Sequence, residues 1–114
     1  MKEHQHRPWG EYEVLSEEMG HKVKRIIVEP GKRLSLQRHS NRAEHWYMLS
    51  GEAVLTIDRE DRPLKSGESV DIPKGTLHRL KNSGKEPVTF IEVQTGDYLG
   101  EDDIERVEDD FGRV

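Results

Sequence analysis

Short runs of alternating apolar and polar residues, each ending at a turn signal, constrain this chain more than any other feature of its sequence. The runs are rich in β-branched and aromatic residues, and turn pairs such as Pro30-Gly31 and Ser66-Gly67 separate them. We expect strands over 22–28, 43–49, 52–58, 68–72, 77–81 and 88–95. Short strands at intervals of about 8–12 residues predict an all-β sandwich or barrel.

The two ends of the chain differ from this pattern. Segment 97–114 holds eight acidic residues against two arginines, and we interpret it as a solvated acidic tail. Within it, the stretch 100–107 opens with acidic residues that suit a helix N-terminus, so the sequence predicts one short C-terminal helix there. At the other end, His4 and His6 form a His-x-His pair that we expect to be frayed, with no carboxylate at a useful spacing.

Length and composition exclude several classes of protein. A chain of 114 residues fits one domain spanning 1–114, with its core over about 7–100. The absence of cysteine excludes disulfide bonds and thiolate metal sites. No apolar run approaches the roughly 18 residues of a membrane span, and the N-terminus does not resemble a signal peptide. With a net charge of −5, we expect a cytoplasmic protein that binds neither nucleic acid nor membrane.

The low apolar content also bears on association. Only 32% of the residues are hydrophobic and 36% are charged, so the core must be small. Exposed edge strands would add a surface on which a second copy could pair. We therefore expect a homodimer, with a contact face that carries Tyr47 and Leu49 and lies opposite to Glu44.

An unusual set of polar residues, Gln37, His39 and Glu44, lies between Gly31 and Gly51. Gln37 and His39 are two residues apart, so on a strand both side chains share one face. Glu44 shares a face with Trp46, which points it inward, where a carboxylate without a partner is costly. A bound cation would offset that cost, and His78 offers a fourth ligand. Two imidazoles, one carboxylate and one amide predict a mixed nitrogen and oxygen site for one divalent ion, namely Zn, Mn, Fe, Co or Ni.

The order and spacing of these residues resemble the two motifs of the cupin family. The first motif reads glycine, His-x-His, glutamate, glycine, and glutamine replaces its first histidine here. The second reads glycine, Pro-x-Gly, histidine, asparagine. The matching positions are Gly31, Gln37, His39, Glu44 and Gly51, followed by Gly67, Pro73, Gly75, His78 and Asn82. The resemblance implies a double-stranded β-helix, also called a jelly-roll barrel.

A narrower resemblance covers residues 7–113, nearly the whole chain. The segments Arg7-Pro8-Trp9-Gly10, Arg42-Ala43-Glu44-His45-Trp46 and 98–104 are similar to the type II mannose-6-phosphate isomerase domain, as is the glutamine at position 37. In that family this domain usually forms the C-terminal part of a bifunctional enzyme, after a mannose-1-phosphate guanylyltransferase. The resemblance implies a sugar-phosphate substrate, and a separate guanylyltransferase as a partner for this domain standing alone.

Further polar residues near these positions are candidates for substrate binding and catalysis. An anionic sugar phosphate needs bidentate donors, which Arg42 and Arg79 could supply. The lysines and arginine at positions 24, 32 and 33 are further phosphate candidates, of which we select Lys32. For the group that moves the proton, three options stay open: Arg42, His45 and Glu92. His45 faces away from Glu44 on a regular strand, and the alternation does not decide whether Glu92 lines the interior or is solvated.

Three functions fit these residues. The first is a metal-dependent isomerase that interconverts mannose 6-phosphate and fructose 6-phosphate, for the synthesis of GDP-mannose and polysaccharide. The second is a non-catalytic module that binds metal and sugar phosphate beside a separate guanylyltransferase. The third is a cupin of other chemistry, such as an oxygenase or epimerase, and Gln37 disfavours the oxygenase because its iron usually has more histidine ligands. Fold alone does not distinguish them.

Overall fold

Eleven β-strands form the part of the protein that the computed structural model describes, residues 4–114, so the first three residues of the expected 1–114 domain lie outside it. The strands are β1 (His4–Arg7), β2 (Gly10–Glu18), β3 (His21–Val28), β4 (Leu36–Arg38), β5 (Arg42–Ser50), β6 (Glu52–Ile57), β7 (Glu60–Lys65), β8 (Ser69–Ile72), β9 (His78–Asn82), β10 (Val88–Gly96) and β11 (Glu105–Glu108).

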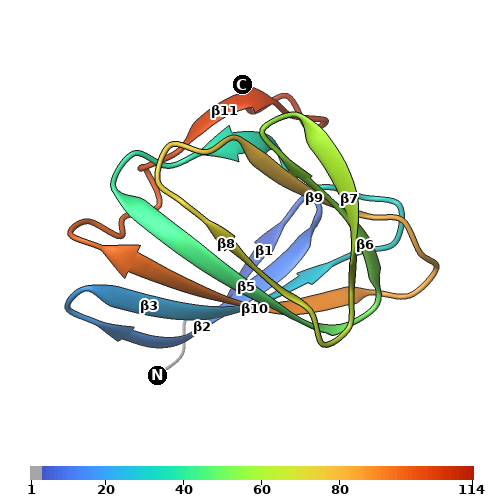
Figure 1. The fold of residues 1–114 in the computed structure, drawn as a ribbon, viewed down its shortest axis with the longest axis horizontal. Helices are drawn as coiled ribbons and strands as arrows, with labels where there is room; N and C mark the ends of the chain where they lie inside the picture. The colour runs from blue at the N-terminus through green and yellow to red at the C-terminus, as the bar shows by residue number, and fades with distance from the viewer. Residues whose placement is uncertain (1–3) are drawn as a thin grey trace.

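The strands build two antiparallel sheets that face each other (Figure 1). The six-stranded sheet has the order β1-β2-β3-β10-β5-β8, and the five-stranded sheet has the order β11-β4-β9-β6-β7. From β3 to β6 and again from β7 to β11, each successive strand lies in the opposite sheet. This winding is that of a double-stranded β-helix, so the all-β jelly-roll prediction is confirmed.

The core lies between the two sheets, and strict alternation along the strands supplies it. In β5, Glu44, Trp46 and Met48 are buried whereas His45 and Tyr47 are exposed. Side chains from the other sheet, including Leu55 and Leu80, complete the apolar cluster. Glu44 occupies one of these inward positions of β5, next to Trp46. The same alternation that builds the core therefore also brings charged groups into the interior.

The C-terminal helix predicted over 100–107 is wrong. Residues Glu105–Glu108 form β11, which pairs with β4, and Arg106 lies opposite Gln37 in the register. The edge of β4 presents unpaired backbone groups, and a strand satisfies them where a short helix could not. Opposite charges favour the same pairing, because Arg38 of β4 forms an ion pair with Glu105. Acidic composition alone therefore misidentified this element.

The expectation of a frayed N-terminus is also wrong for His4 and His6. Both lie in β1, which pairs with β2 through Arg7 and Gly10 at the turn. Strand β2 (Gly10–Glu18) was not predicted from the sequence, although its residues alternate as pairing with β3 requires. Of the residues described, none forms a helix long and apolar enough to cross a membrane.

Candidate metal centre

His39, Glu44 and His78 meet inside the barrel, where all three are buried. Each offers one ligand atom, and these atoms lie within 4.8 Å of one another. His39 directly follows β4 and His78 begins β9, both in the five-stranded sheet, whereas Glu44 belongs to β5 in the other sheet. The predicted ligand group is therefore brought together from both sheets across the interior.

Backbone carbonyls orient both imidazoles toward this common point. The Nδ1 of His39 donates to the carbonyl oxygen of Asp103 at 2.7 Å, and the Nδ1 of His78 donates to that of Thr76 at 2.8 Å. With Nδ1 protonated, each Nε2 carries the lone pair that a metal ion binds. The Nε2 of His78 is buried without any hydrogen-bond partner. Such an orphaned acceptor is costly unless a further group, such as a cation, satisfies it.

The charge states also fit a metal site. Burial and the neighbouring Arg42 cation lower the pKa of His39 to about 4. Burial likewise lowers the pKa of His78. Both imidazoles are therefore neutral near pH 7, as ligation requires.

Glu44 is held between cationic and polar donors. Its Oε2 accepts from the Nε of Arg42 at 2.8 Å and lies 3.2 Å from the Nε2 of His39. Its Oε1 accepts from the indole Nε1 of Trp46 at 2.9 Å and lies 3.8 Å from the Nε2 of His78. Each carboxylate oxygen thus faces one of the two imidazoles. This arrangement is expected if one ion binds the carboxylate and both imidazoles.

Gln37 lies next to this group because it pairs with His78 in the register between β4 and β9. Its amide nitrogen donates to the carbonyl of Ser35 at 3.5 Å, which leaves the amide oxygen as the free acceptor. Two neutral imidazoles, a carboxylate and an amide oxygen fit a divalent ion of the zinc, manganese, iron, cobalt or nickel class. The residues present therefore suit the predicted cofactor.

A second buried carboxylate, Glu92 of β10, adjoins the first. The Nε1 of Trp46 donates to both Glu44 and Glu92, and the Nε2 of Gln94 donates to Glu92 at 2.7 Å. Burial and the nearby Glu44 carboxylate raise the pKa of Glu92 to about 7. The side chain points inward, which resolves the orientation that the alternation of residues had left open.

A cavity of about 220 Å³ lies beside this group and is lined by Gln37, Arg42 and Glu92. Aromatic and aliphatic residues form part of its wall, and the remaining polar lining is mostly cationic: Arg7, Lys24, Arg106 and Arg113, with Glu101. Lys24 is paired with Glu101 at 2.9 Å, and Arg42 is paired with Glu44. Cationic lining of this kind suits an anionic ligand.

Three of the residues selected from the sequence lie elsewhere. His45 is exposed on the outer face of β5, where its Nδ1 lies 2.7 Å from Asp71. Arg79 is buried outside the cavity, where it donates to the carbonyl of Leu34 and to Glu108. Lys32 is exposed and pairs with Glu29. Arg42 and Glu92 therefore remain as the selected residues that the structure brings beside the ligand group.

Sequence reasoning missed the cationic residues Arg7, Arg106 and Arg113 that line the cavity. The position of Arg106 follows from the pairing of β11 with β4, which the predicted helix concealed. The place of Arg7 follows from its pairing with Gly10 in the hairpin of β1 and β2, two strands that were not predicted from the sequence. In both cases the missing strand concealed the side chain, because only a strand places it on a defined face.

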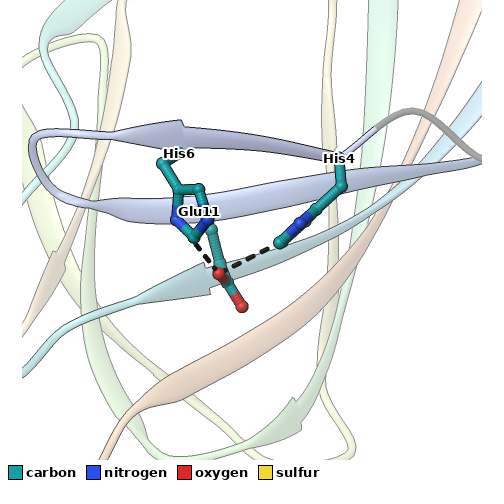
Figure 2. A group of neighbouring side chains, drawn as sticks. All are labelled: His4, His6 and Glu11. Carbon is teal, nitrogen blue, oxygen red and sulfur yellow. Dashed lines mark hydrogen bonds and ion pairs between the residues drawn. The ribbon is translucent and has the colours of Figure 1, made fainter.

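A second group that could hold a metal ion lies on the surface. Figure 2 shows His4 and His6 of β1 turned toward Glu11 of β2, with His4 Nε2 3.1 Å and His6 Nδ1 3.5 Å from the same carboxylate oxygen. The side chain of His6 is 80% exposed. Water satisfies such exposed atoms, so this group lacks the buried, unsatisfied acceptor that marks the interior group.

Comparison with known proteins decides the family of this chain. The family model described as mannose-6-phosphate isomerase C-terminal matches residues 1–109. The chain belongs to this family. Its jelly roll with an interior His, His and Glu group is therefore the isomerase-type cupin domain that the motifs at Gln37 and His78 resemble.

Relatives within the isomerase C-terminal family are substantially longer. The xanthan biosynthesis protein XanB of Xanthomonas campestris is 53% identical over 109 residues, which cover 96% of this chain and 23% of that protein. The mannose-1-phosphate guanylyltransferase ManC of Salmonella typhimurium is 49% identical, with the same coverage of both chains. The chain thus spans about a quarter of the length of these relatives.

A solved structure gives independent support for the fold. A conserved protein with a double-stranded β-helix domain from Klebsiella pneumoniae superposes with a TM-score of 0.74 at 26% identity, covering 84% of this chain and 82% of that one. The family and the architecture therefore agree.

Proposed function

We propose that this domain is a metal-dependent mannose-6-phosphate isomerase that interconverts mannose 6-phosphate and fructose 6-phosphate. One observation carries this proposal: the orphaned Nε2 of the buried His78 faces Glu44 and His39 beside a cavity lined with Arg42 and Glu92. The family match and the named relatives in polysaccharide synthesis support the same substrate class. We propose a cytoplasmic location on the same grounds.

The ligands would be Gln37, His39, Glu44 and His78, and one divalent ion held there would polarise the sugar carbonyl and stabilise negative charge on its oxygen. Aldose–ketose isomerisation moves a proton between adjacent carbons through an enediol. A base with a pKa close to the working pH transfers such a proton most effectively. Glu92 meets this requirement, because it is buried, lines the cavity and has a raised pKa of about 7.

The surrounding hydrogen bonds give Glu92 a defined position. Trp46 donates to one of its oxygens and Gln94 to the other, which fixes the plane of the carboxyl group. We propose that Glu92 takes the proton from C2 and returns it to C1, while the hydroxyl proton passes from O2 to O1. Arg42, already paired with Glu44, would orient the sugar oxygens and balance the negative charge of the enediolate that forms when the carbon loses its proton.

The test is conversion by purified protein whose metal content is controlled. Chelator-treated protein should form no fructose 6-phosphate from mannose 6-phosphate, and one of the candidate divalent ions should restore conversion. Exchange of the C2 proton with solvent, followed by NMR, should depend on the same ion and should be lost in Glu92→Gln. Metal-loaded protein that binds the sugar phosphate but exchanges no proton would contradict the isomerase function.

A second function has a specific observation in its favour. Relatives such as ManC have the name mannose-1-phosphate guanylyltransferase. In this alternative the domain is a non-catalytic module that binds metal and sugar phosphate beside a separate guanylyltransferase. Wild-type protein that retains both ligands without conversion, and that binds a guanylyltransferase, would favour this alternative.

A further inference from the structure

Arg106 differs from the cationic residues of the cavity that are paired with a carboxylate, namely Arg42, Lys24 and Arg113. Its Nε is buried and has no hydrogen-bond partner. By contrast, Arg42 donates to Glu44, Lys24 donates to Glu101, and Arg113 donates to Asp109 through Nε and Nη2. A buried guanidinium nitrogen without an acceptor is costly, so the site suits an acceptor that arrives with a ligand.

The position of Arg106 relative to the candidate metal ligands follows from the sheet register. Arg106 of β11 lies opposite Gln37 of β4, and Gln37 lies opposite His78 of β9. Residues paired in this way share a face of the sheet, so these three side chains form a row that faces the interior. Two strand spacings separate Arg106 from His78, or about 10 Å between their backbones.

Two further arginines lie close to Arg106 and increase the positive charge around it. Burial, then Arg113 and Arg7, lower the pKa of the Arg106 guanidinium. Arg7 donates to neutral acceptors, namely Gln5, a backbone carbonyl and Tyr12. Arg7, Arg106 and Arg113 form a cluster of three positive charges. Asp109 forms an ion pair with one of them, Arg113. The cluster therefore holds excess positive charge at the wall of the cavity.

We propose, on the basis of the function given above, that Arg106 together with Arg7 and Arg113 binds the phosphate group of the substrate. A hexose 6-phosphate carries its phosphate at the end of the carbon chain opposite to the reacting carbonyl. The row from His78 through Gln37 to Arg106 provides this arrangement, with the ligand group at one end and the cationic cluster at the other. A phosphomonoester dianion supplies the acceptors that the Nε of Arg106 lacks, and guanidinium groups bind such oxygens in bidentate fashion.

This assignment replaces two of the phosphate binders expected from the sequence, Arg79 and Lys32. Arg79 donates to Leu34 and Glu108 outside the cavity, and Lys32 lies at the surface beside Glu29. Neither residue lines the cavity, whereas Arg7, Arg106 and Arg113 do. The specificity for a phosphorylated sugar would thus depend on the C-terminal strand and on the N-terminal hairpin.

The experiment compares Arg106→Gln and Arg106→Lys with the matched control Arg62→Gln, which removes the same charge from an exposed position on β7. Isothermal titration of metal-loaded protein would measure binding of mannose 6-phosphate, inorganic phosphate and mannose. We expect Arg106→Gln to weaken binding of the two phosphate ligands on the order of a hundredfold. Arg106→Lys should give an intermediate loss, and the metal content and mannose binding should stay at the wild-type level.

The outcomes separate this subsite from the isomerase function. If wild-type protein converts the substrate but Arg106→Gln binds both phosphate ligands as the wild type does, the subsite is wrong and the isomerase stands. If Arg106→Gln loses phosphate binding but the wild type makes no fructose 6-phosphate, the subsite stands and the isomerase is wrong. Should Arg106→Gln fail to fold, Arg106→Lys and Arg7→Gln decide the question, and unchanged phosphate binding in both would overturn the subsite.

Discussion

Arg42 contacts two of the candidate metal ligands without being one of them. Its Nε lies 2.8 Å from Glu44, and its Nη2 lies 3.3 Å from the Nε2 of His39. Burial alone would lower the pKa of Arg42, but the carboxylates of Glu44, Glu92 and Glu101 raise it, so the residue stays charged. It can therefore position the ligands and face the substrate in the same cavity.

Replacing Arg42 should separate metal binding from turnover. Arg42→Ala is expected to keep metal content near that of the wild type while kcat/KM for mannose 6-phosphate falls on the order of a hundredfold. His78→Ala and Glu44→Ala should each lose metal and activity together, because each removes a direct ligand. Metal analysis by mass spectrometry beside a coupled assay measures both quantities. Loss of metal in Arg42→Ala would show that the arginine is needed to assemble the site.

Asp103 holds the candidate ligand His39 and the two residues after it in position. Its carboxylate accepts from the backbone N–H groups of Ser40 and Asn41, and its carbonyl accepts from His39. Although burial acts in the opposite direction, the N–H groups of Asn41 and Ser40 hold the pKa of Asp103 below its usual range. The residue thus holds the loop between β4 and β5 in place.

Asp103→Asn should weaken this loop. An amide keeps one acceptor oxygen but places an NH₂ group against the other N–H, so we expect a loss of about 2 kcal/mol in the free energy of unfolding. Urea unfolding measures it, and Asp97→Asn at an exposed position serves as the control, with a change within about 0.5 kcal/mol. Equal stability of the two variants would contradict the supporting role.

At the level of single residues, the sequence predicted that His39, Glu44 and His78 lie together, and the structure brings them together, because their spacing is local to two motifs. Gln37, His39 and Glu44 lie close together in the chain, and strand alternation orients them. Of the residues selected from the sequence for substrate binding, Arg42 lines the cavity, whereas Arg79 and Lys32 do not. Arg79 adjoins His78 in sequence but points to the opposite side of β9, whereas Arg106 comes from a distant strand that only the sheet register brings to Gln37.

Among the elements, β11 and the residues after it form several ion pairs with arginines of the barrel. Asp110 accepts from Arg33 at 2.7 and 2.8 Å, Glu105 pairs with Arg38, and Glu108 pairs with Arg79. The arginine partners hold the pKa values of Asp110 and Glu105 below their usual ranges. The acidic tail is therefore paired with the barrel, although most of its acidic side chains are exposed.

Stability should consequently fall on acidification. Hydrogen bonds from Arg113 lower the pKa of Asp109 to about 2. A carboxyl group with a lowered folded-state pKa stabilises the fold above its unfolded pKa of about 4, and this contribution is lost as the pH falls toward 2. We expect Tm to decrease steadily between pH 5 and about pH 2, with a smaller decrease in Asp109→Asn. A wild-type Tm that stays flat over this range, measured by calorimetry, would contradict this linkage.

The strands illustrate what pattern alone can predict. Alternating β-branched runs such as Val88–Gly96 were predicted correctly because their apolar faces are needed in the core. Short polar strands such as Glu60–Lys65 and Glu105–Glu108 were missed, because pairing with a neighbouring strand defines them more than apolar burial does: Glu60–Lys65 buries only Leu64, and Glu105–Glu108 buries no residue fully. Local composition contains little information about such edge pairing.

For the whole molecule, association remains a prediction. Tyr47 and Leu49 are 43% and 44% exposed on the outer face of β5, on the side opposite to Glu44. An exposed aromatic and aliphatic pair on a sheet face favours contact with a second copy. Light scattering at micromolar concentration should give a dimer mass, and Tyr47→Glu should give a monomer that keeps its metal. A monomeric wild type would reject the dimer.

Metal removal should also destabilise the protein as a whole. A ligand that binds only the folded state stabilises it by about 2.7 kcal/mol at a concentration one hundred times its Kd. We expect chelation to lower Tm and the candidate ion to raise it in proportion to the logarithm of its concentration. His78→Ala should lose this dependence, whereas exposed His45→Ala should keep it. A Tm that does not respond to metal in the wild type would argue against the interior site.

The candidate centre draws His39 and His78 from one sheet and Glu44 from the other, and this has a consequence for the life of the protein in the cell. An ion bound there joins the two sheets, so the open states that proteases attack become rarer when it is present. Scarcity of the metal would then reduce the number of intact protein molecules as well as the turnover rate of each molecule. Cells starved of the ion would degrade the metal-free protein and retain the metal-bound protein.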